Sequence, residues 1–246
     1  RVTARDHTLR INDFTAKAVL RNNRIDPLTV EADSSIGPVK ITGRIRQVLT
    51  DPQADLSLDG TMDLSGIKDL LGLKQAVSGK ADLNAELKGK FSGPVLKVSL
   101  TSQQAVAGPV SLTLDMAGHV ENAVFYLDRL STRTDDIMLN GRGRYAFRTG
   151  DVRAALELTA ENIHSAADLA GLKNVSGRLE MTADVSGKIT DPTAALDITA
   201  RNLDIASLPL DYVSGRAGLS DGDLTVQFLD LHRLKSHCRV TGNIGL

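Results

Sequence analysis

The sequence has 246 residues, of which 41% are hydrophobic, 24% charged and 3% aromatic, and this composition excludes a disordered chain. Its 29 Lys and Arg offset 30 Asp and Glu, so the chain lacks the basic excess of proteins that bind nucleic acid. The one cysteine, Cys238, excludes an internal disulfide and any metal site built from several cysteines. No run of 18 apolar residues is present to span a membrane as a helix, and no signal peptide is visible.

Apolar and polar residues alternate in short segments from the N-terminal part of the chain onward. In chain order, the clearest segments are 39–46, 55–59, 82–88, 96–101, 110–115, 156–158, 179–186 and 196–198. Successive side chains of a strand point to opposite faces, so this period of two predicts strands with one apolar and one polar face. One-sided strands of this kind are typical of antiparallel sheets, because parallel sheets are covered on both faces.

Turn dipeptides separate these segments. Pro27, Pro52 and Pro192 follow Asp, whereas Pro38, Pro94 and Pro109 follow Gly, and both dipeptides favour turns. Further turns are predicted at 22–23, 135–136, 149–151 and 220–223. With strands arriving every 10–16 residues, we expect about sixteen of them.

Two segments, 65–73 and 165–172, interrupt the alternation with apolar spacings of three and four residues, and each begins with a serine suited to cap a helix. We expect two short helices there.

These helices belong to an internal repeat. Residues 64–94 align with 163–192, so that Gly79 matches Gly177 and Gly89 matches Gly187, each 98 residues apart. The related strings ITGRI (41–45), LNGRG (139–143) and VTGNI (240–244) flank the block. We expect one continuous repetitive sheet over 1–246, with repeat units 41–138 and 139–239, rather than two independent domains. Because the sequence begins with Arg1 and ends within a predicted strand, we also expect it to be a segment of a longer protein.

The apolar face predicted for this sheet is larger than two short helices can cover. About sixteen strands give an apolar face of about 1,500 Å², and the two helices cover about 300 Å² of it. The sheet either folds onto itself as a dry sandwich or forms a trough that holds something apolar. The medium-sized aliphatic side chains and the repeat favour the trough. Its expected lining is Val39, Ile41, Leu56, Leu58, Leu83, Ala85, Leu87, Val98, Leu100, Leu112, Leu114, Leu156, Leu158, Leu179, Met181, Val185, Leu196 and Ile198.

Two stretches carry a family resemblance. DLSGIKDLLGLKQAVSGKADLNAELKGKFSGP (63–94) and residues 168–231 both contain a Leu-rich helix, then SG with an alternating strand, then a glycine and proline before another strand. The second stretch continues with NLDI (202–205) and DGDLTV (221–226). In this pattern most of residues 40–246 resembles the AsmA/TamB family of Gram-negative envelope proteins.

The resemblance implies an all-β fold, in which a long, curved, mainly antiparallel repetitive sheet forms a U-shaped hydrophobic groove with two short helices. It also implies a periplasmic location, a parent chain anchored in the inner membrane, and transfer of phospholipid or another acyl-chain lipid between inner and outer membrane. An outer-membrane protein is then an expected partner, and contact with the membrane comes from parts of the parent chain outside this segment. The alternative that stays open is a structural or adhesive β-repeat module with a dry interior, acting through its surface.

Three candidate chemical sites give weak signals. Residues 141–146 match G-x-G-x-x-(G/A), but a strand and a turn, rather than a helix, are predicted to follow. His232, His237 and Cys238 lie on one strand-like segment without a second ligand cluster. Asp135–Asp136 and Asp221 with Asp223 sit at predicted turns, where Asp bonds to the local backbone. We therefore expect no enzyme activity, no cofactor and no metal site.

Overall fold

The structure is a computed structural model that describes residues 2–4, 7–9, 11–65, 77–108, 110–164, 167 and 174–245. Apart from Ser65 and Ala167, the two predicted helices at 65–73 and 165–172 lie outside the described residues.

The described residues form strands joined mainly by short turns, as the period of two predicts. In chain order the strands are β1 (Val2–Ala4), β2 (His7–Leu9), β3 (Ile11–Arg21), β4 (Arg24–Ser34), β5 (Gly37–Arg46), β6 (Gln53–Asp63), β7 (Val77–Ser78), β8 (Lys80–Lys90), β9 (Val95–Ala107), β10 (Val110–Glu121), β11 (Val124–Arg133), β12 (Ile137–Ala146), β13 (Asp151–Ala160), β14 (Val175–Lys188), β15 (Asp191–Ile205), β16 (Leu208–Ser220), β17 (Asp223–Arg233) and β18 (Ser236–Gly245).

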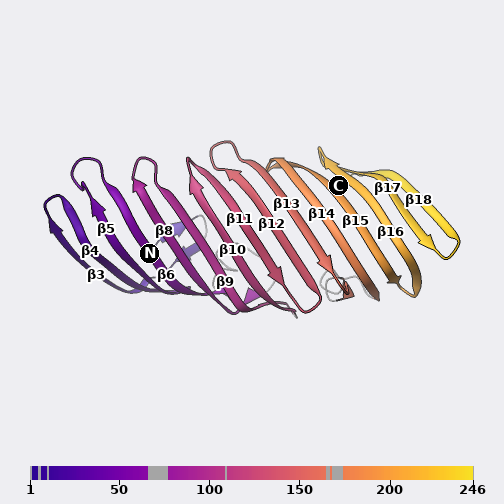
Figure 1. Ribbon diagram of the computed structural model, residues 1–246, viewed down its shortest axis with the longest axis horizontal. Helices are drawn as coiled ribbons and strands as arrows, with labels where there is room; N and C mark the ends of the chain where they lie inside the picture. The colour runs from indigo at the N-terminus through magenta and orange to yellow at the C-terminus, as the bar shows by residue number, and fades with distance from the viewer. Residues whose placement is uncertain are drawn as a thin grey trace. The chain divides into compact units, whose positions relative to one another are not determined.

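Sixteen of the described strands belong to one antiparallel sheet, whose order follows the sequence from β3 to β18 with β7 set beside β9 (Figure 1). In the described part of the chain, no pairing joins β3 to β18 and closes the sheet. The remaining strands, β1 and β2, pair with each other. The predicted all-β class and antiparallel pairing are thus confirmed.

Most predicted turns are found, but the prediction is wrong for three proline dipeptides: Gly37–Pro38 and Asp191–Pro192 are the first two residues of β5 and β15, and Asp26–Pro27 is not a turn either. The Asn22–Asn23 turn joins β3 to β4 with both residues at positive φ, 48° and 60°. Asp26 and Pro27 instead lie inside β4, where the register with β5 shifts between Ile25 and Leu28. A bulge accommodates the proline because the residues of a bulge do not all donate to the ladder.

The chain divides into two compact units, Arg1–Asp128 and Arg129–Leu246, and the division falls inside β11. Each unit is described by itself below.

The repeat seen in the sequence recurs in the backbone. Strands β5 and β6 correspond to β12 and β13, β7 and β8 together (77–90) correspond to β14, and β9, β10 and β11 correspond to β15, β16 and β17, with similar lengths. The Leu64 N–H donates to the Gly79 carbonyl at 2.9 Å, and the Ile163 N–H donates to the Gly177 carbonyl at the same distance. Both glycines have positive φ, 112° and 128°, a conformation that side chains with a Cβ rarely adopt. Gly79 and Gly177 thus have the same backbone conformation and accept the same hydrogen bond at the start of corresponding strands.

Each unit has a small buried cluster beside this strand entry. In the first unit, Leu64 packs with Ala81 and Ala105. In the second unit, the cluster is larger and consists of Ala160, Ile163, Ala167, Val175, Ala200, Leu203, Leu210 and Val213. Ala residues account for much of both clusters, so the protein buries few large side chains.

Candidate functional site

The cross-strand register of the first unit places the predicted lining residues on a single face. Ile41 lies opposite Leu58, Leu58 opposite Ala85, and Ala85 opposite Val98, which makes one row of apolar residues over four strands. Residues directly opposite each other in an antiparallel pair project to the same face, so each row adds to one surface. The other lining residues of this unit belong to parallel rows on the same face: Val39, Leu83 and Leu100; Leu56 and Leu87; and Leu112 and Leu114 on β10.

The second unit repeats this arrangement. Leu158 lies opposite Met181, which lies opposite Ile198. The neighbouring rows contain Leu156, Ala183 and Leu196, then Leu179 and Ala200, then Val185 and Ala194. We call the faces that these rows form the apolar face of each unit, and the opposite side its polar face.

All eighteen predicted lining residues are half-buried rather than buried. Within each unit, the extensive contacts of a described strand are with strands beside it in the sheet, so no second sheet covers the apolar face. Each lining residue therefore keeps part of its surface accessible to solvent.

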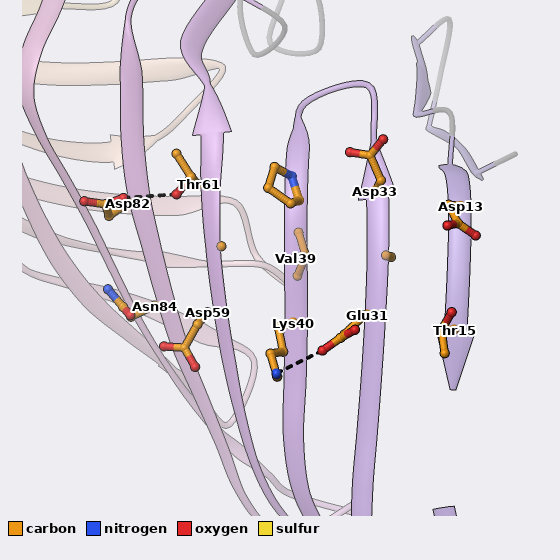
Figure 2. Close-up of a pocket in the computed structure, with 13 residues that line it drawn as sticks. Asp13, Thr15, Glu31, Asp33, Val39, Lys40, Asp59, Thr61, Asp82 and Asn84 are labelled. Carbon is orange, nitrogen blue, oxygen red and sulfur yellow. Dashed lines mark hydrogen bonds and ion pairs between the residues drawn. The ribbon is translucent and has the colours of Figure 1, made fainter. Parts of the chain in front are cut away.

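A hollow in the first unit lies on the polar face, which sequence reasoning did not anticipate. It has a volume of about 760 Å³ and is lined by residues of β3 to β6 and β8. Figure 2 shows Lys40 pointing toward Glu31 and Thr61 toward Asp82, at 2.9 Å and 3.2 Å respectively. The hydrogen bond from Lys40 lowers the pKa of the Glu31 carboxyl.

A second hollow of about 420 Å³ lies further along the same face. There the Arg44 guanidinium donates to Asp55 at 2.7 Å and 3.0 Å and lowers the pKa of that carboxyl. Both hollows are lined mainly by charged and hydroxyl side chains, so neither suits a hydrocarbon chain. The polar face therefore offers hollows for polar or charged groups, whereas the apolar face offers rows of aliphatic side chains.

The sequence motifs that resembled a dinucleotide site and a metal site lie in strands of the sheet. Residues 141–146 are part of β12, and a turn and β13 follow them, so the helix that a dinucleotide site needs is missing from this described stretch. His237 lies opposite His232, but Cys238 lies opposite Leu231 and therefore projects from the apolar face. Among the described residues, no group of three His, Cys, Asp or Glu side chains is arranged to hold a metal ion.

One ion pair in the second unit has a well-shielded carboxylate and an exposed guanidinium. Arg239 on β18 donates from Nε and from Nη2 to the two oxygens of Asp230 on β17, each at 2.6 Å, and the Asp230 side chain is only 12% exposed. Mainly because of these bonds, the pKa of Asp230 is lowered to about 2. His237 contacts the same carboxylate at 3.3 Å, and Arg239 lies over the Phe228 ring. The pair joins the last two strands.

Comparisons with known proteins add no family: no family model matches the sequence, and neither a curated protein nor a solved structure matches it. No described segment forms a helix long and apolar enough to cross a membrane. The functional argument therefore depends on the geometry of the two faces.

Proposed function

We propose that this chain is an interior segment of an AsmA/TamB-like lipid-transfer protein, whose apolar face forms the floor of a groove that carries phospholipid acyl chains. The observation that supports the proposal is the apolar face itself: its rows of aliphatic side chains are only half-buried, and among the described strands none packs over it within either unit. Soluble proteins rarely leave contiguous rows of aliphatic side chains partly open to water, which supports a ligand that covers them.

The chemistry of the rows suits movement as well as binding. Each methylene group that leaves water contributes about 0.8 kcal/mol, so an acyl chain lying across several strands is held without any polar contact. Rows such as Ile41, Leu58, Ala85 and Val98 contain no charged residue. Because no position on this floor binds an acyl chain much more tightly than its neighbours, the acyl chain can slide from one row to the next.

The polar face then stays in water, and transfer of the lipid needs no catalytic residue. In this proposal the segment works in the periplasm, the parent chain is anchored in the inner membrane, and an outer-membrane protein receives the lipid. The proposed ligand is a phospholipid or another lipid with acyl chains.

A photo-crosslinking amino acid tests the proposal, because neighbouring residues on one strand project to opposite faces. The probe is placed at Leu83 or Met181 on the apolar face, and at Asp82 or Glu180 on the polar face as matched controls. Purified protein is incubated with phosphatidylethanolamine and phosphatidylglycerol vesicles, irradiated and analysed by mass spectrometry. We expect lipid adducts at Leu83 and Met181 and none at the controls.

Two other outcomes contradict the proposal. Equal lipid labelling from both faces shows that the lipid does not distinguish them. Crosslinks between two protein chains from Leu83 or Met181, without lipid adducts, show that a second copy covers the apolar face and favour the structural module.

A further inference from the structure

Three arginines stand side by side where β3, β4 and β5 come to the same end of the first unit. Arg21 lies opposite Arg24, and Arg24 lies opposite Arg46. Directly opposite residues are about 5 Å apart at Cβ, and like charges in such pairs destabilise a sheet. Arg46 also shares the polar face with Lys40 and Arg44, because the three alternate along β5. The row therefore collects positive charge at one point of the polar face, at a cost in stability.

These arginines line a hollow. It has a volume of about 400 Å³, and its walls are Arg21, Asn22, Asn23, Arg24, Asp26, Arg46 and Gln47. The one carboxylate, Asp26, lies 3.7 Å from the Arg24 Nε. In the described part of the chain, Arg21 and Arg46 have no ion-pair partner. With three guanidinium groups and one carboxylate, the hollow has an excess of about two positive charges.

The walls of this hollow are held in place by bonds between two turns. The Asn23 side-chain oxygen accepts from the Leu49 N–H at 2.8 Å, and the Asn23 carbonyl accepts from the Val48 N–H at 3.2 Å. The Gln53 amide donates to the Gln47 side-chain oxygen at 3.1 Å. These bonds tie the β3–β4 turn to the segment between β5 and β6, so the backbone around the hollow is already in place before a ligand binds.

We propose that this hollow, the arginine pocket, binds a phosphate group carried as a free phosphate, a phosphomonoester or a lipid headgroup. Guanidinium groups match the oxygens of phosphate in geometry and in charge, and a doubly charged anion offsets the excess in the pocket. A bound phosphate also removes the repulsion along the arginine row, which accounts for a row that otherwise destabilises the sheet. The proposal does not depend on the acyl-chain function, because the pocket lies on the polar face.

Binding measurements at fixed ionic strength test the arginine pocket. Inorganic phosphate is titrated into the protein by calorimetry, and vesicles of phosphatidylcholine with and without phosphatidic acid are tested by flotation. We expect R46Q to weaken phosphate binding about tenfold, the loss of one charge-assisted contact. The matched control is R153Q, which removes the same charge from an exposed strand position of the second unit and should leave binding unchanged.

The outcomes separate the two sources of phosphate. Binding of inorganic phosphate that depends on Arg46 supports the pocket with a free anion, and binding only to phosphatidic acid vesicles supports it with a headgroup. Circular dichroism should show that R46Q folds and, without phosphate, melts at the same or a higher temperature, because one like-charge contact is gone. Equal losses in R46Q and R153Q, or no binding of either probe, overturn the proposal.

Discussion

Two leucines on one strand test whether the apolar face is open to solvent. Leu203 and Leu196 both belong to β15 of the second unit. Leu203 is 8% exposed and packs in the buried cluster, whereas Leu196 is half-buried and lies between Ala183 and Ala217 in the neighbouring strands. Replacing each with alanine removes the same three carbon atoms from two different surroundings.

The expected costs differ because only one site loses buried surface and leaves a cavity. Three carbon atoms at about 0.8 kcal/mol each give about 2.4 kcal/mol for complete burial. At Leu203 a cavity adds to this value, so we expect Leu203→Ala to lower the free energy of unfolding by about 3 kcal/mol. At Leu196 a smaller part of the side chain is already in water and no closed cavity forms around it, so we expect about 1.5–2 kcal/mol.

The assay is urea unfolding of protein that has first been unfolded and refolded to strip bound lipid, followed by circular dichroism. Both variants should show the wild-type dependence of free energy on urea. A Leu196→Ala cost equal to that of Leu203→Ala would falsify the open face and show that protein covers it. Repeating the measurement at several protein concentrations then tells a second copy from the chain itself, because only association depends on concentration.

Two further predictions concern stability. The pKa of Asp230 is lowered to about 2, so the ion pair with Arg239 stabilises the fold fully above the ordinary Asp pKa, and this stabilisation is lost as the pH falls through about 2. Asp230→Asn should therefore lower the free energy of unfolding at pH 6, and the difference from wild type should shrink as acid is added. A constant difference across a pH series of urea curves would contradict this account. Gly177 has a φ of 128°, and a Cβ there would meet the Asn202 carbonyl oxygen at 2.6 Å, so Gly177→Ala should cost about 1–3 kcal/mol in thermal melts. The control Gly93→Ala has no atom within 4 Å of its new methyl group and should be almost neutral, so similar losses in the two variants would argue against strain.

The period of two predicted strands in the segments where the alternation was clear, together with the face on which their residues lie. Asp82 and Leu83 differ by one position and project to opposite sides, as the alternation requires. The glycine match between Gly79 and Gly177 likewise corresponds to two equivalent backbone bonds. These features are local or repeated, so the order of residues determines them.

Features that depend on register and on approaching turns were not predictable. The arginine pocket requires Arg21, Arg24 and Arg46 to meet across two strand pairs, although Arg24 and Arg46 are 22 positions apart in the sequence. The Asp26–Pro27 dipeptide had a turn signature, but a bulge inside β4 satisfied the same backbone constraint. The hollows on the polar face depend on how neighbouring strands twist, and alternation carries no information about that.

The lone thiol of the chain has a practical consequence. Cys238 is exposed and projects on the aliphatic side of the outermost strand of the second unit. A solvatochromic dye attached there by maleimide chemistry would report hydrocarbon arriving nearby as a blue-shifted emission, without any engineered cysteine. The same atom could form an adventitious bridge between two molecules in air, so reductant belongs in every preparation.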